Sequence, residues 1–103
     1  SLGFSKSTLP CFSIWKNTQA LADGYCTGLE PATNFPNFKA MEREQGRVVK
    51  LESGATWETS LTMTHLVSAQ EVTGEQQRIA QLQGNTPPEI DRKLIPGISA
   101  EVE

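Results

Sequence analysis

The most constraining feature of the sequence is a regular alternation of side chains across residues 55–67. One set of positions is mostly apolar and the other is polar or charged: Ala55, Trp57, Thr59, Leu61, Met63, His65 and Val67 against Thr56, Glu58, Ser60, Thr62 and Thr64. Successive side chains of a strand point to opposite faces, so this pattern predicts a half-buried antiparallel strand. At about thirteen residues, it would be more than twice the length of a mean strand of about 5–6 residues. Strands of that length are typical of large sandwiches.

Other segments also favour strands. Residues 9–16 are rich in aromatic and β-branched side chains, and Pro10 places their start near a sheet edge. A short strand is predicted over residues 25–29, ended by Glu30 and Pro31, because proline cannot donate to a ladder.

The middle of the chain predicts a long connection followed by a hairpin. Residues 33–45 read as a loop with one helical turn before Gly46. A strand over 46–51 and a tight turn at 52–54 should then pair with the alternating segment.

The character changes after Ser68. Ser68 and Glu71 have the spacing of a capping box, apolar side chains follow at helical intervals, and Gly84 supplies a stop, so a helix is predicted over residues 69–83. Residues 85–103 contain three prolines and no period, which predicts an irregular tail.

These elements predict an all-β fold with too few strands and helices to cover its own apolar faces. A chain of 103 residues has the size of one domain, yet three or four strands and one helix leave few partners for the apolar faces. We therefore expect residues 1–84 to be part of an antiparallel β-sandwich. Either the chain associates through its sheet edges or the rest of its sheet lies elsewhere.

Composition excludes several classes of function. The formal net charge is −3 and the basic residues are scattered, so neither nucleic acid nor an anionic membrane is an expected partner. The longest apolar run covers only residues 20–22. The first residues do not show the charged segment followed by an apolar segment that is typical of a signal peptide. The sequence predicts neither a membrane span nor an intact signal peptide.

The sequence offers too few metal ligands of the cysteine and histidine types for a metal cluster: Cys11, Cys26 and the single histidine, His65. No nucleophile motif accompanies His65. The two cysteines could form a bridge or stay reduced. We favour reduced thiols and a cytoplasmic location. His65 falls on the apolar face of the alternating segment, where a packed histidine is favoured over a role at a cleft rim.

Glu30 is the leading candidate for chemistry. It follows an apolar strand, stands between Gly28 and Pro31, and opens into a loop rich in asparagine and aromatic residues. This placement suggests a fixed, partly desolvated carboxylate suited to general-base work. The structural alternative is an ion pair with Arg43 or Arg47.

The residues around Glu30 resemble a known family. Gly24-Tyr25-Cys26-Thr27-Gly28-Leu29-Glu30-Pro31 and the following Asn-Phe-Pro turn are similar to the C-terminal region of aldose 1-epimerases, the galactose mutarotase superfamily. The longer run from Ser13-Ile14-Trp15-Lys16-Asn17-Thr18 to Glu42-Arg43-Glu44-Gln45-Gly46-Arg47 resembles one branch, the domain of unknown function 4432. The resemblance covers about residues 9–84.

This resemblance implies a large antiparallel β-supersandwich with a sugar held in a cleft on one concave sheet. It implies that Glu30 takes the proton from the anomeric hydroxyl while a histidine protonates the ring oxygen, with neither metal nor nucleotide cofactor. In the family that histidine lies upstream of the matched region, and His65 does not match it. We therefore expect the chain to be the C-terminal part of such a protein and to be inactive alone.

Neighbouring residues have two readings each. Trp15 could stack on a sugar face or fill the core, and Lys16 and Asn17 could donate to sugar hydroxyls, although Asn17 could equally cap a turn. Arg47 could reach an acidic group on the substrate or hold Glu30 or Glu42. Asn34, in the loop after Glu30, is a further candidate for substrate binding. The competing functions are a non-catalytic carbohydrate-binding or sensing module, and a structural sheet that assembles through its edges.

Overall fold

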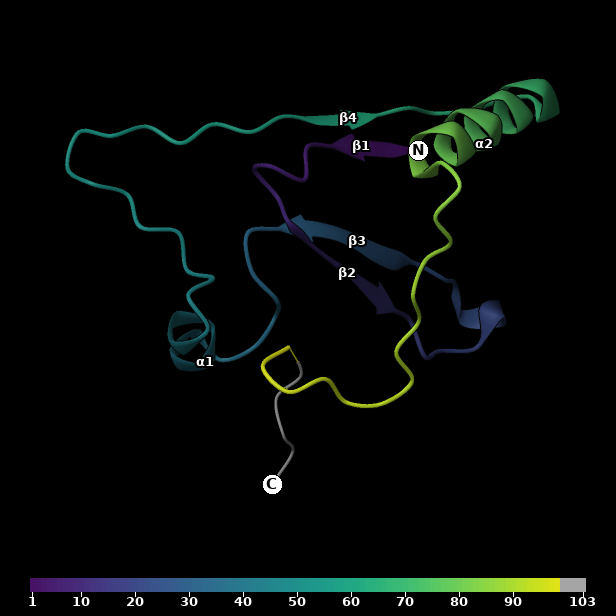
Figure 1. The fold of residues 1–103 in the computed structure, drawn as a ribbon. Coiled ribbons are helices and arrows are strands. Elements are labelled where there is room, and N and C mark those ends of the chain that lie inside the picture. Colours follow the sequence, from purple (N-terminus) through teal and green to yellow (C-terminus); the bar gives the residue numbers. More distant parts are fainter. Residues whose placement is uncertain (99–103) are drawn as a thin grey trace.

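The computed structural model describes residues 1–98, which form a β-rich fold with two separate small sheets (Figure 1). In chain order the elements are β1 (Leu2–Phe4), β2 (Cys11–Lys16), the 3-10 turn η1 (Leu21–Asp23), β3 (Thr27–Ala32), α1 (Lys39–Glu44), β4 (Leu61–Met63) and α2 (Ala69–Gln83). One antiparallel sheet pairs β1 with β4, and the other pairs β2 with β3.

The pairing of β2 with β3 confirms one predicted strand and corrects another. β2 starts at Cys11, directly after Pro10. The prediction that Pro31 ends its strand is wrong, because β3 continues through Pro31 to Ala32. Within the described residues β3 has a neighbouring strand on one side only. The backbone nitrogen of Pro31, which carries no hydrogen, can therefore face away from β2.

The long predicted strand is wrong in its extent. Only Leu61–Met63 forms a strand, β4, which pairs with the equally short β1, a strand that the sequence patterns did not reveal. The turn after residue 51 does form, with the Ala55 N–H donating to the Glu52 carbonyl at 3.0 Å. Residues 46–51 and 55–60 are not paired, however, and the extended segment that leads into β4 has no neighbouring strand (Figure 1).

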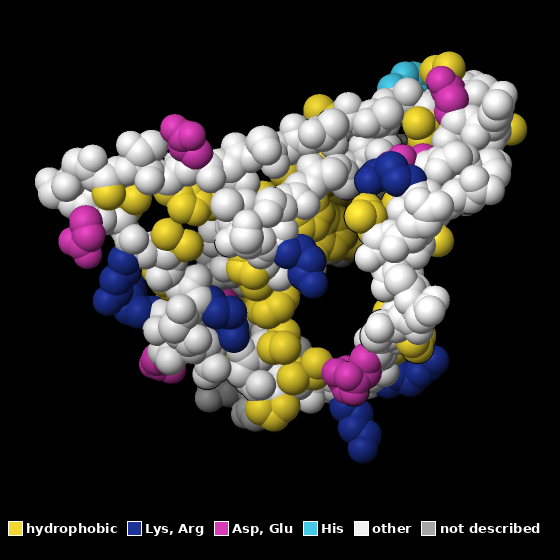
Figure 2. All heavy atoms as spheres, turned by 45° about the horizontal axis from the view of Figure 1, so that its top comes forward, with side chains coloured by type: hydrophobic (Ala, Val, Ile, Leu, Met, Phe, Trp, Pro, Cys, Tyr) yellow, Lys and Arg dark blue, Asp and Glu magenta, His cyan; other side chains and the backbone are white. Residues whose placement is uncertain are grey.

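Few apolar side chains are shielded from water. Leu9 and Cys11 are the buried hydrophobic residues of the described part. The two sheets are linked by stacking of Phe4 on Phe12, with ring centroids 5.5 Å apart. Hydrophobic side chains remain visible between the elements in Figure 2. The expected shortage of packing partners is therefore present in the structure.

The helix α2 has the bounds that the sequence predicts. The Ser68 hydroxyl accepts a hydrogen bond from the Glu71 N–H at 3.2 Å, and the Glu71 carboxylate accepts one from the Ser68 N–H at 2.9 Å. Gly84 ends the helix with a φ of 66°, which favours glycine. Residues 85–98 of the predicted tail contain neither helix nor strand, and residues 99–103 lie outside the described part.

Replacing Ser68 with alanine removes the acceptor of the Glu71 N–H, and we expect α2 to lose about 1 kcal/mol of stability. Far-ultraviolet circular dichroism should show less helix in Ser68→Ala than in the unsubstituted chain. Ser53→Ala, in the exposed turn after residue 51, should leave the helix signal unchanged. Equal signals from all three chains would contradict this role of the cap.

Candidate functional site

Alternation along β2 and β3 divides their side chains between two faces. Ser13 lies opposite Glu30 and Trp15 lies opposite Gly28, so these residues share a face, which we call the Glu30 face. Phe12, Ile14, Leu29 and Pro31 lie on the other, which we call the apolar face. The Glu30 side chain and the side chains of Phe12 and Ile14 therefore lie on opposite faces of this sheet.

The carboxylate of Glu30 bends back over Gly28. A Cβ atom at Gly28 would stand 2.6 Å from Glu30 Oε1 and 3.2 Å from the Cβ of Trp15, so glycine makes room for both side chains. The expected strand-end, partly desolvated position is not found, because Glu30 is exposed and lies within β3. The structural alternative, an ion pair with Arg43 or Arg47, is not formed within residues 1–98.

Of the predicted sugar contacts, only Trp15 lies beside Glu30. Its side chain is 53% exposed, which leaves ring surface available for stacking. Lys16 is paired with Thr27 and points to the opposite face. Asn17 closes the connection after β2, since its Oδ1 accepts from the Gln19 N–H at 2.9 Å and its Nδ2 donates to the Gly24 carbonyl at 3.3 Å.

Asn34 and Arg47 are held by other groups. Asn34 Nδ2 donates to the Phe35 carbonyl at 2.8 Å, and its Oδ1 accepts from the Thr33 hydroxyl at 3.2 Å. Arg47 donates through Nε and Nη2 to the two oxygens of Glu42, both at 2.7 Å, with its guanidinium 5.2 Å from the centre of the Phe35 ring. The structure thus places Arg47 with Glu42, one of the two partners considered from the sequence.

Glu42 is the centre of a buried polar cluster that the sequence patterns did not single out. Its side chain is fully buried and also accepts hydrogen bonds from the Phe35 N–H at 3.2 Å and from Asn37 Nδ2 at 2.8 Å. The hydrogen bonds from Arg47, followed by those from Asn37 and Phe35, outweigh desolvation and lower the pKa of Glu42 from its usual 4.5 to about 2. Glu42 is therefore a structural anion.

His65 lies on the other side of β3 from Glu30. A packed histidine was expected, but His65 is exposed. It borders a hollow of about 670 Å³ between the two sheets. Leu29, Pro31 and Met63 line the same hollow. The chain's single histidine and its leading carboxylate therefore face different spaces.

The remaining chemistry-bearing groups are dispersed. Cys11 is buried, Cys26 is exposed, and the two are not bridged. Among residues 1–98, no three side chains of the His, Cys, Asp and Glu types gather closely enough to hold a metal ion. Neither helix of the described part combines the length and the hydropathy that a membrane crossing needs.

Comparison with known proteins defines the family. The family model described as "Domain of unknown function (DUF4432)" matches residues 1–65. The chain belongs to this family. The matched residues include both sheets, the Glu30 face and the Glu42 cluster, whereas α2 follows them. No curated protein and no solved structure matches the chain.

The lowered pKa of Glu42 predicts an acid-sensitive fold. A carboxyl group whose folded pKa lies below its unfolded value stabilises the fold above the unfolded value, and loses that contribution as the pH falls through the folded value. We expect the urea concentration at the midpoint of unfolding to decrease as the pH is lowered from about 4.5 to about 2. Glu42→Gln should lower the midpoint at neutral pH, and its difference from the unsubstituted chain should shrink towards pH 2.

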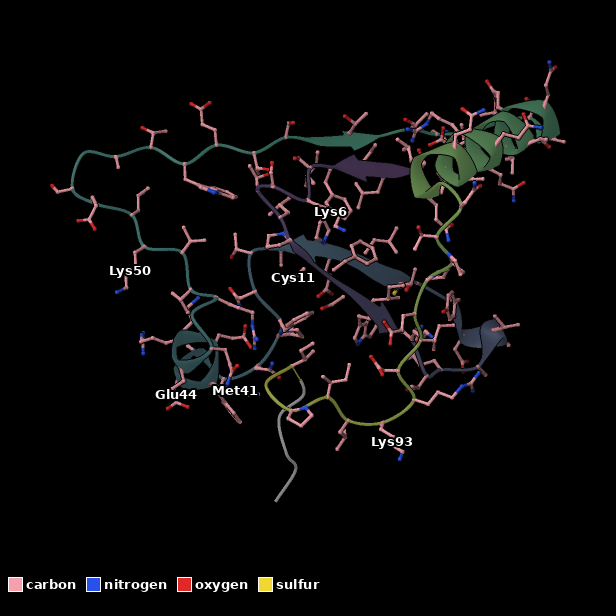
Figure 3. All side chains as sticks on the ribbon, in the orientation of Figure 1. Lys6, Cys11, Met41, Glu44, Lys50 and Lys93 are labelled. Carbon is pink, nitrogen blue, oxygen red and sulfur yellow. The ribbon has the colours of Figure 1, made fainter. Side chains whose placement is uncertain are left out.

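Glu44→Gln provides the matched control, because Glu44 lies on the outer side of the same helix, away from the cluster (Figure 3). Its urea midpoint should follow that of the unsubstituted chain at every pH. An equal loss of stability in both variants would contradict a specific role for Glu42.

Proposed function

We propose that this chain forms the base-bearing C-terminal part of a sugar-binding β-sandwich that interconverts the anomers of an aldose. The observation that carries the proposal is the exposed Glu30 carboxylate, which bends back over Gly28 on the same face as the half-exposed Trp15. A carboxylate next to an aromatic surface suits a sugar, which presents apolar C–H faces and hydroxyl edges. The resemblance of the Leu29-Glu30-Pro31 segment to aldose 1-epimerases supports the same assignment.

The proposed reaction is general acid–base ring opening. Glu30 removes the proton of the anomeric hydroxyl while an acid donates a proton to the ring oxygen. The bond between the anomeric carbon and the ring oxygen breaks, and the open aldehyde rotates about its C1–C2 bond. Closure on the other face returns both protons and gives the second anomer. The atoms and charges balance without a metal or nucleotide.

The acid belongs to a part of the protein outside this chain. His65 borders the hollow on the other side of β3 from Glu30. Exposed apolar side chains such as Ile14, at 53%, and Leu29, at 49%, are consistent with cover by the rest of a β-supersandwich. Two unbridged cysteines support a cytoplasmic location for the protein.

In the parent protein that contains this chain, Glu30→Gln should lower the rate of anomer exchange by about 10²–10⁴-fold, because it removes the base. Polarimetry or NMR exchange spectroscopy on a reducing hexose measures that rate. The 103-residue chain alone should show none, since acid and sugar positioning are both lost. Glu52→Gln, in an exposed turn, should leave the parent's rate unchanged.

Two outcomes would contradict the catalytic proposal: an unchanged rate in Glu30→Gln, or catalysis by the isolated chain that Glu30→Gln abolishes. A second candidate function is a carbohydrate-binding or sensing module without turnover. Glu30 and the half-exposed Trp15 share one face of the sheet, and sugar binding on that face needs no acid. Saturable hexose binding by the parent protein, weakened by Trp15→Ala and unaccompanied by faster anomer exchange, would establish it.

A further inference from the structure

The sheet formed by β2 and β3 has two outer edges, and Pro31 makes them different. Pro31 lies opposite Phe12 but has no N–H to exchange with it. Hydrogen-bonded and non-hydrogen-bonded pairs alternate along an antiparallel ladder. The exchanged bonds therefore belong to the neighbouring pairs, Cys11 with Ala32 and Ser13 with Glu30.

This alternation fixes the direction of the remaining main-chain groups. The N–H and C=O groups of Phe12 and Ile14 point away from β3 and form the outer edge of β2. The outer edge of β3 presents Leu29 and Pro31, and its donor row is interrupted at Pro31. Within residues 1–98, no main-chain hydrogen bond from a loop or turn reaches Phe12 or Ile14.

We propose that a second copy of this chain pairs with the outer edge of β2, strand against antiparallel strand. The two β2 strands would join the two sheets into one of four strands, β3-β2-β2-β3. An open edge with regular donors and acceptors is a template for such pairing, whereas proline protects an edge. The asymmetry created by Pro31 thus directs association to β2.

The side chains of β2 fit a copy of themselves. β2 contains no acidic residue and one basic residue, Lys16, at its end. A two-fold axis at Ile14 sets Ile14 opposite its own copy and Phe12 opposite Lys16 of the second copy, so no like charges face each other. Phe12 and Ile14, 40% and 53% exposed, would continue the apolar face across the new junction.

Proline substitution at each edge gives a matched test. Ile14→Pro and Leu29→Pro each remove one outward N–H and leave the ladder between β2 and β3 intact. Light scattering on the 103-residue chain should give the mass of a dimer. Ile14→Pro should halve that mass, and Leu29→Pro should leave it unchanged.

Amide hydrogen exchange tests the same pairing in the unsubstituted chain, which keeps the proposal testable if a proline variant unfolds. The Phe12 and Ile14 amides should exchange more slowly as protein concentration rises, and the Leu29 amide should not change. A monomeric chain, equal effects of the two substitutions, or concentration-dependent protection at Leu29 would overturn the proposal. A monomeric parent protein with protected Phe12 and Ile14 amides would also overturn it, by assigning the edge to another strand of the same molecule.

Discussion

The arrangement of the middle of the chain depends on the buried carboxylate of Glu42. An isolated charge is very costly to remove from water. Both carboxylate oxygens of Glu42 must therefore accept hydrogen bonds in the buried position. Here the Phe35 N–H, the Asn37 amide and the Arg47 guanidinium converge on the carboxylate from both sides of α1. Asn37 also donates to the Ile98 carbonyl at 2.7 Å. One anion therefore ties the loop after β3, the start of the next segment and the distal chain together.

This anchoring determines which part of the Glu30 face stays open. Cys11, at one end of that face, is buried, and it lines a hollow together with Thr33, Arg47 and Trp57. Trp15, at the other end, is half-exposed. Pro31 adds a second constraint, because it commits the main chain of Glu30 to the ladder with Ser13 while the carboxylate stays free. The Glu42 cluster and Pro31 thus hold the backbone around Glu30 without binding its side chain.

The sequence predicted elements whose signals are local, and it failed where an element needs a distant partner. The first and last residues of α2 were predicted correctly, because the helix is capped by Ser68, Glu71 and Gly84, which the sequence itself shows. The alternation over residues 55–67 describes a chain that can form a strand, but the length of a strand also depends on its neighbour. That neighbour, β1, offers only Leu2–Phe4.

The candidate site shows the same division. The type and spacing of residues singled out Glu30 and Trp15, but the pairing of β2 with β3, which places them on one face, was not predicted. Arg47 was assigned two possible partners, and the choice of Glu42 required the fold of the intervening turn. The burial of Glu42 left no periodic signal, because α1 is a six-residue helix whose neighbours are all loops. The other five residues of the helix are exposed or half-buried.

The two proposals concern surfaces that do not overlap. A sugar would occupy the Glu30 face, and a second copy would occupy the outer edge of β2. The apolar face remains, with the hollow of about 670 Å³ between the two sheets. Burial of apolar surface contributes about 25 cal/mol per Å², so a further layer over Leu29 and its neighbours would stabilise the fold without obstructing either site. The sparse core is therefore compatible with a sheet that becomes part of a larger assembly and keeps one face free for a ligand.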